Sequence, residues 1–95
     1  MVSRVLIVQL YGHLRRDASS QYLEIRLGEK KPLIAALNLL PESVRRQILD
    51  ERGGIRPGFL ILVNDVDART VHGYEVEVSD SDRIVIVPMI HGGGN

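Results

Sequence analysis

The chain of 95 residues has no cysteine, no net charge and few aromatic residues, and each deficit excludes a class of protein. Without cysteine there is no disulfide framework, thiolate zinc site, iron–sulfur cluster or thiol nucleophile. Twelve basic side chains balance twelve acidic ones, so overall charge favours neither nucleic acid nor an anionic membrane. No aromatic residues interleave with the arginine pairs at 15–16 and 45–46, so we interpret these pairs as solvated surface.

A long apolar segment is also missing. The N-terminal run from Val5 to Leu10 is too short for a signal-peptide core or a membrane-spanning helix, so we expect a cytoplasmic protein without membrane contact. Apolar residues make up 44% and charged residues 25%, close to the average of soluble globular chains. We therefore predict one domain over residues 1–90, followed by a flexible glycine-rich tail over residues 91–95.

The order of structural signals predicts two strands, two helices and three strands. Alternating or β-branched runs favour strands, and apolar residues spaced by three or four favour helices. The expected strands are Val5–Val8, Tyr22–Leu27, Phe59–Val63, Tyr74–Val78 and Arg83–Val87, of which the first two form a hairpin and the last two flank a tight turn at Ser79–Asp82. The helical stripe comprises Leu33, Leu37, Leu40, Val44 and Ile48. Pro41 lies inside it and lacks an amide hydrogen, so we expect a second short helix to start there.

Two strands in succession at the start of the chain favour an α+β fold of the ubiquitin-like β-grasp type over a ferredoxin-like one. We predict a mixed sheet of four to five strands wrapped around one main helix, with a short second helix. Three of the strands are apolar on both faces, but one helix about 10 Å wide covers only one face of such a sheet. The second face is either hidden by curvature and loops or is a docking surface for a partner.

The chain shows no pattern of catalytic residues. Its glycines around Ile55–Pro57 lack the lysine and hydroxyl of a phosphate-binding loop. His13, His72 and His91 each adjoin a glycine and have no metal-ligand spacing, so we interpret them as turn residues and expect no metal site. The acidic pairs, Asp65 with Asp67 and Asp80 with Asp82, are likewise interpreted as turn residues that accept local backbone hydrogen bonds.

The C-terminus, Pro88-Met89-Ile90-His91-Gly92-Gly93-Gly94-Asn95, remains as the candidate functional element. It is either a frayed end or a thread whose glycines pass a narrow channel and let another enzyme approach the backbone closely. It also completes a multi-point pattern. Ile55 to Asp67, the acidic turn at Ser79–Asp82 and the ending Ile90-His91-Gly92-Gly93 resemble the ubiquitin-related modifier family and, more loosely, the MoaD and ThiS sulfur carriers.

The resemblance implies a β-grasp protein that is not itself an enzyme, has no catalytic residue and binds no cofactor. Its reacting group would be the carboxylate of a C-terminal glycine among Gly92, Gly93 and Gly94. An E1-like adenylyltransferase would use ATP and magnesium to form an acyl-adenylate, and sulfur would then replace AMP to give a thiocarboxylate. The acceptor would be tRNA, through a tRNA-thiolation enzyme, a cofactor precursor, or the lysine amine of a target protein, with no direct binding of nucleic acid.

The sequence departs from the family pattern because Gly94 and Asn95 follow the two glycines. Three explanations are open. A processing peptidase trims the end, the two residues remain from recombinant expression, or this member of the family is never activated. We prefer the first two, with an active form that ends at Gly93 or Gly94.

Two alternative functions stay open at this level. One is the small, MoaD-type subunit of molybdopterin synthase, whose tail enters the large subunit. The other is a non-covalent binding module with an idle tail. We expect partners to dock on the sheet face of the last strand and its neighbour, with the first tail residues leading into a channel. The candidate docking residues are Phe59, Ile61, Val85, Val87, Met89, Ile90 and His91.

Overall fold

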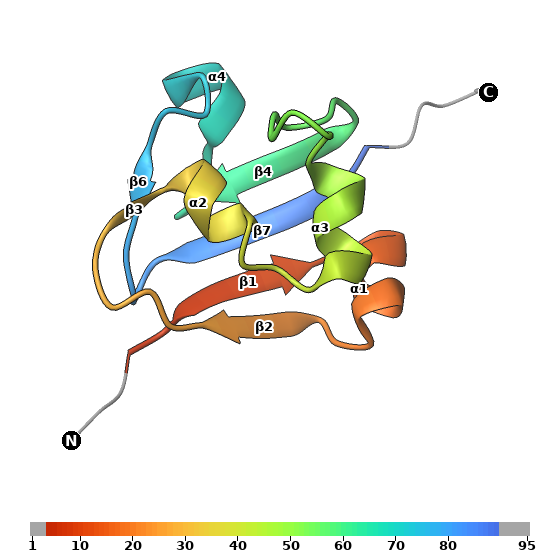
Figure 1. The fold of residues 1–95 in the computed structure, drawn as a ribbon, viewed down its shortest axis with the longest axis horizontal. Coiled ribbons are helices and arrows are strands. Elements are labelled where there is room, and N and C mark those ends of the chain that lie inside the picture. The colour runs from red at the N-terminus through yellow and green to blue at the C-terminus, as the bar shows by residue number, and fades with distance from the viewer. Residues whose placement is uncertain (1–3, 90–95) are drawn as a thin grey trace.

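A five-stranded mixed sheet organises the chain (Figure 1). The computed structural model describes residues 4–89. The strands follow the order β2 (Tyr22–Ile25), β1 (Leu6–Leu10), β7 (Arg83–Pro88), β4 (Phe59–Val63) and β5 (Val66–Asp67). β1 is antiparallel to β2 and parallel to β7, and β7 is antiparallel to β4. The last strand in the sequence therefore lies in the centre of the sheet, and the predicted hairpin of the first two strands is confirmed.

Two short helices cover one face of this sheet (Figure 1). They are α2 (Leu33–Leu37) and α3 (Glu42–Ile48), and Pro41 caps the start of α3 as predicted. A proline fits there because it has no amide hydrogen and the first turn of a helix needs none. The helical stripe thus forms two helices of five and seven residues, as predicted, and residues 38–41 separate them.

Two further helices were not predicted. α1 (Gly12–Ala18) connects β1 to β2, and α4 (Ala68–His72) follows β5. Each is only one to two turns long and buries a single residue, Leu14 or Ala68, so neither produces an apolar period in the sequence. β5 was missed for a similar reason, because two residues are too few to show alternation.

The predicted strand Tyr74–Val78 is largely wrong. Only β6 (Glu77–Val78) is a strand, and it pairs with β3 (Lys31–Pro32) in a separate two-stranded sheet. Tyr74 has a φ of 68°, in the left-handed region, which is incompatible with an extended strand. The other predicted strands are confirmed to within about two residues, as is the turn at residues 79–82.

The core lies between the helices and the sheet face that they cover. The whole predicted helical stripe is buried in it. The sheet contributes alternate residues of its central strands, which are Leu6, Val8, Leu10, Ile61, Val63, Ile84 and Ile86. Burial of each such side chain contributes about 1.5–3 kcal/mol, so the core holds β7 in place.

Candidate functional site

The C-terminal end of β7 is the point from which the glycine-rich segment departs. Pro88 pairs with Phe59 in the sheet, and the amide of Met89 donates a hydrogen bond of 2.8 Å to the carbonyl oxygen of Gly58. On the other side of β7, the amide of Tyr11 donates to the carbonyl oxygen of Ile86 at 3.1 Å. The chain is thus held on one edge as far as Ile86 and on the other as far as Met89, whose side chain is 45% exposed.

Gly12 allows a close approach at this point. Its φ is 61°, and a Cβ atom added there would lie 3.2 Å from Cγ of Pro88. A larger residue would therefore suffer both backbone strain and a contact with the proline ring. The start of α1 packs directly against the end of β7 for this reason.

The predicted reactive residues, Gly92, Gly93 and Gly94, lie outside the described residues, and so do Ile90 and His91. The boundary between domain and tail, placed at residue 90, also falls there and stays a prediction. What the structure provides is the anchor of the tail at Met89 and the sheet surface beside it.

The face of the sheet opposite the helices carries a band of apolar side chains, which we call the open face. Cross-strand pairing places Leu60 beside Val87 and Leu62 beside Val85. Three of these four are half-buried, and Val85, in the middle of the sheet, is 8% exposed. Val85 is absent from the cluster of core residues, which shows that neighbours on the open face cover it. The face that one helix could not cover therefore remains partly accessible.

A polar residue is embedded in the same face. Gln9 lies beside Val85 in the parallel pair of β1 and β7 and is only 8% exposed. Its amide nitrogen donates a hydrogen bond of 2.7 Å to the hydroxyl oxygen of Tyr11, which satisfies a group that would be costly to bury alone. Tyr11 is 40% exposed and borders the end of β7.

The predicted docking residues do not share one face. Val85 and Val87 belong to the open face, whereas Phe59 and Ile61 point toward the helices, and Ile61 is 1% exposed. Ile61 is corrected to a core residue, because a partner cannot reach it in the folded protein. Sequence reasoning missed Leu60 and Leu62, since both alternating positions of this strand are apolar and the pattern does not distinguish the faces.

The acidic turn residues hold loops together. The carboxylate of Asp80 accepts hydrogen bonds from the amides of Leu27 and Gly28, at 2.8 and 2.9 Å. Asp67 caps α4 by accepting from the amides of Arg69 and Thr70. These bonds support the interpretation of the acidic residues as structural.

Hydrogen bonding lowers the pKa of three of these carboxyls. The backbone amides of Leu27 and Gly28 lower the pKa of Asp80, and the Thr70 hydroxyl, with nearby amides, lowers that of Asp67. Burial raises the pKa of Asp82, but its hydrogen bonds with Asn64 and Ser79 outweigh this effect, and the pKa is lowered overall.

The folded protein should lose stability in acid. A carboxyl with a lowered pKa in the folded state contributes stability above its unfolded-state pKa, and this contribution disappears as the pH falls through the folded-state pKa. We expect the free energy of unfolding to decline below about pH 5. Asp80→Asn should lower it at pH 7 and flatten the acid decline, as measured by urea unfolding from pH 7 to pH 2.

Asp65→Asn is the matched control, because within residues 4–89 its carboxylate accepts none of the hydrogen bonds described for the other turn aspartates. Equal pH profiles for Asp80→Asn and Asp65→Asn would contradict the structural role of Asp80.

His13 and His72 lie apart. The Nε2 atom of His13 is 2.9 Å from Oε1 of Gln47, and its ring lies 6.5 Å from that of Phe59. His72 is in the last turn of α4. Within residues 4–89 no three metal-ligating side chains come together, and no helix of this region has the length and hydrophobicity of a membrane span.

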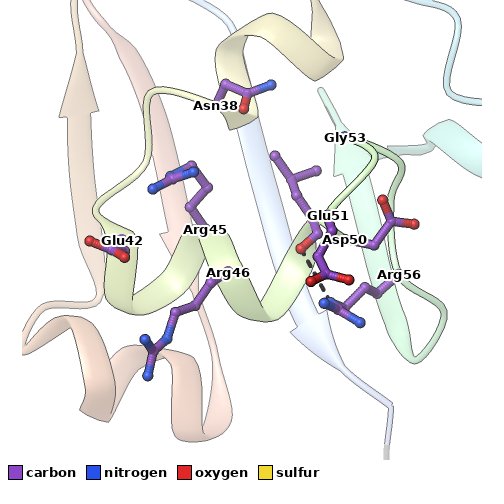
Figure 2. A pocket seen from close by; sticks show the side chains of 9 residues that line it. Asn38, Glu42, Arg45, Arg46, Asp50, Glu51, Gly53 and Arg56 are labelled. Atoms are coloured by element: carbon purple, nitrogen blue, oxygen red, sulfur yellow. Dashed lines mark hydrogen bonds between the residues drawn. The ribbon is translucent and has the colours of Figure 1, made fainter.

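A polar hollow of about 320 Å³ lies beside α3, and Figure 2 shows the side chains around it. Arg45, Arg46 and Glu42 come from the helix and Arg56 from the loop before β4. The arginine side chains extend in different directions rather than toward one point (Figure 2). Nε of Arg56 donates to the carbonyl oxygen of Leu49 at 3.2 Å, so this arginine supports the loop before β4.

Comparison with known proteins identifies the family. The family model described as Urm1 (Ubiquitin related modifier) matches residues 17–93. A Ubiquitin-related modifier 1 homolog of Drosophila willistoni is 41% identical over 90 residues, covering 88% of this chain and 83% of the relative. The homolog of Dictyostelium discoideum is 38% identical over 56 residues, or 59% of this chain and 56% of the relative. The chain thus spans about half the length of several curated relatives that it matches.

A solved structure supports the same assignment. The solution structure of Urm1 from Trypanosoma brucei superimposes with a TM-score of 0.72 at 28% identity, covering 98% of this chain and all of that one. This similarity confirms the predicted ubiquitin-like β-grasp fold. Since the family model covers most of the chain, from residue 17 to residue 93, the conclusion is direct: the chain belongs to the ubiquitin-related modifier family.

Proposed function

We propose that this chain is a sulfur carrier and protein modifier that reacts through its C-terminal glycine. An E1-like adenylyltransferase, with ATP and magnesium, joins the glycine carboxylate to AMP and releases pyrophosphate. A sulfide-level sulfur nucleophile then attacks the carbonyl carbon, AMP leaves, and a thiocarboxylate remains. Activation is needed because a carboxylate repels nucleophiles and has no good leaving group, whereas the mixed anhydride has AMP.

In this proposal the chain is a co-substrate, and its partner is the enzyme. Its own residues present the reacting end, since the bonds of Tyr11 and Met89 to their neighbours anchor the tail to the sheet. The thiocarboxylate passes sulfur to tRNA through a tRNA-thiolation enzyme, or the activated end is joined to a lysine of a target protein.

The observation that carries the proposal is the extent of the family match, which runs through Gly92 and ends at Gly93. It supports a modifier rather than the small subunit of molybdopterin synthase. It also supports an active form that ends at Gly93 or Gly94, after a peptidase has removed Asn95.

Incubation of a chain made to end at Gly93 or Gly94 with ATP, magnesium and the E1-like protein of the same host tests the proposal. Intact-mass spectrometry should show AMP or one sulfur in place of oxygen on the terminal glycine. Protein purified from its native host should lack Asn95. A fully active species that retains Asn95, or a chain without Gly92–Asn95 that keeps its cellular function, would refute this chemistry and favour a non-covalent binding module.

We also propose that the activating enzyme docks on the open face next to the tail anchor. Leu60→Lys or Val87→Lys places a charge where an apolar contact would form, so the catalytic efficiency kcat/KM of adenylation should fall roughly tenfold or more, mainly through KM. Pyrophosphate release at varied concentrations of the carrier measures this effect.

The matched control for docking is Val71→Lys. Val71 is an apolar residue on α4 that is 61% exposed. This variant should keep the kcat/KM of the wild type. A similar loss in all three variants would point to a general charge effect and exclude the open face as the specific docking surface.

A further inference from the structure

A second hollow, which is apolar and separate from the open face, lies at the two-stranded sheet of β3 and β6. It has a volume of about 450 Å³. Its floor is formed by Pro32 and Ile34 at the start of α2, together with Tyr74 and Val76 from the segment that leads into β6. The register of β3 and β6 places Pro32 opposite Glu77, on the side away from buried Val78.

The walls of this hollow are fixed by backbone hydrogen bonds. The amide of Leu33 donates to the carbonyl oxygen of Val76 at 2.8 Å, which ties α2 to the segment before β6. The amide of Tyr74 donates to the carbonyl oxygen of Ala68 at 2.9 Å and holds the tyrosine at its left-handed φ of 68°. A bulky residue rarely adopts this conformation, and here the bond to Ala68 of α4 stabilises it.

The rim of the hollow is acidic. Glu75 and Glu77 line it and are both exposed, and no lysine or arginine is among its lining residues. Within residues 4–89 neither glutamate forms an ion pair. Lys31 on the adjacent strand β3 forms one with Glu29, and its Nζ atom lies 3.6 Å from Oε2 of Glu29. Apolar floor and negative rim together are complementary to an apolar side chain that has basic neighbours.

The two-stranded sheet that carries the hollow lies toward the other end of β7 from the tail anchor, although Tyr74 also lines a smaller hollow with Gly58 and Phe59 beside that anchor. The turn at residues 79–82 connects β6 to the first residue of β7, whereas the tail leaves from the last one. Six residues of extended strand separate these ends, which corresponds to about 17–20 Å. A partner bound at the hollow and an enzyme acting on the tail can therefore occupy the protein together. Figure 1 shows β3 and β6 at the side of the molecule opposite the end of β7.

We propose that this hollow binds a segment of a partner protein in which an apolar anchor residue is flanked by lysine or arginine. The anchor contacts Ile34, Tyr74 and Val76, and the flanking cations pair with Glu75 and Glu77. This surface is additional to the tail chemistry and does not depend on it. It gives the protein a means to hold one partner while its tail reacts with another.

Defined peptides test the binding mode. The probe is Lys-Leu-Lys-Phe-Leu-Lys, blocked at both ends, and the control peptide has glutamate in place of each lysine. In titrations of ¹⁵N-labelled full-length protein, the basic peptide should shift the amide signals of Ile34, Tyr74 and Val76. The acidic peptide should bind at least about tenfold more weakly. The titration uses neither ATP nor an activating enzyme, so its failure would leave the proposed tail chemistry intact.

Variants then separate charge from fold. Glu75→Lys with Glu77→Lys should weaken the basic peptide roughly fivefold to tenfold and improve the acidic one. The control Glu24→Lys with Glu51→Lys makes the same charge change at exposed sites outside the hollow and should alter neither affinity. Val76→Thr keeps the shape of the floor but adds a hydroxyl, and it should weaken the basic peptide without changing the backbone spectrum.

Three outcomes would overturn the inference. The first is equal affinity for both peptides, or no binding of either. The second is a set of shifts on Leu60, Leu62 and Val87 instead of the hollow. The third is the same shifts on raising the protein concentration without peptide, which would make a second copy of the chain the occupant.

Discussion

In a chain made to end at residue 93, replacing Gly93 by valine is expected to reduce formation of the thiocarboxylate at least about a hundredfold. A glycine lets another enzyme approach the backbone at its carbonyl carbon, and a branched Cβ beside the reacting carbonyl prevents that approach. Because Gly93 follows the described domain, the substitution should leave the free energy of unfolding unchanged. Intact mass after incubation with ATP, magnesium and the activating enzyme gives the yield, and urea unfolding gives the stability.

Deletion of Asn95 is the control for this experiment. If the tail is trimmed before activation, a chain made without Asn95 should react, whereas the full chain should not react until a peptidase has removed that residue. A Gly93→Val protein that gains sulfur at the normal rate would contradict the central role assigned to the terminal glycines.

The second large effect is expected from Ile61→Ala. Ile61 is 1% exposed and packs in the core opposite Ile86, so its truncation should lower the free energy of unfolding by about 2–5 kcal/mol. Leu62→Ala, one residue further along the same strand, removes a half-buried side chain from the open face and should cost about 1 kcal/mol. Urea unfolding of the two variants measures the difference.

The KM of the activating enzyme should depend on the two residues in the opposite way from the free energy of unfolding. Leu62→Ala should raise the KM for the activating enzyme while the protein stays folded, whereas Ile61→Ala should keep a normal KM under conditions in which it is folded. Equal unfolding free energies for the two variants would show that the strand does not separate a core face from an open face.

The sequence contains enough information for most of the fold, because long apolar patterns survive into the structure. The stripe from Leu33 to Ile48 predicted the paired helices, and the strand at residues 59–63 is as predicted. α1 and β5 could not be predicted, since a seven-residue helix with one buried residue and a two-residue strand have no period to detect. Their positions follow from tertiary contacts and hydrogen bonds rather than from local preference.

The sequence predicted the C-terminal motif of the candidate site but not which residues form the docking surface beside it. The pattern from Ile55 to Gly93 led to the family that the comparisons show. The assignment of docking residues to a face failed for Phe59 and Ile61, because consecutive apolar residues fit either side of a strand. The apolar hollow with the acidic rim could not be predicted from the sequence either. Ile34 and Tyr74 are forty residues apart, and the pairing of β3 with β6 brings their segments together.

The central position of β7 has a consequence for synthesis of the protein. β1, β2 and β4 all precede β7, yet β1 and β4 are joined only through it. Because such non-local pairing cannot form until the last strand has been made, the nascent chain stays without a complete sheet until translation is nearly finished. A product truncated before residue 83 therefore lacks both the strand that completes the domain and the C-terminal glycines to which the proposed reaction is assigned. Under the proposed function, a prematurely terminated chain would acquire neither a complete fold nor a reacting end, and the activating enzyme could not use it.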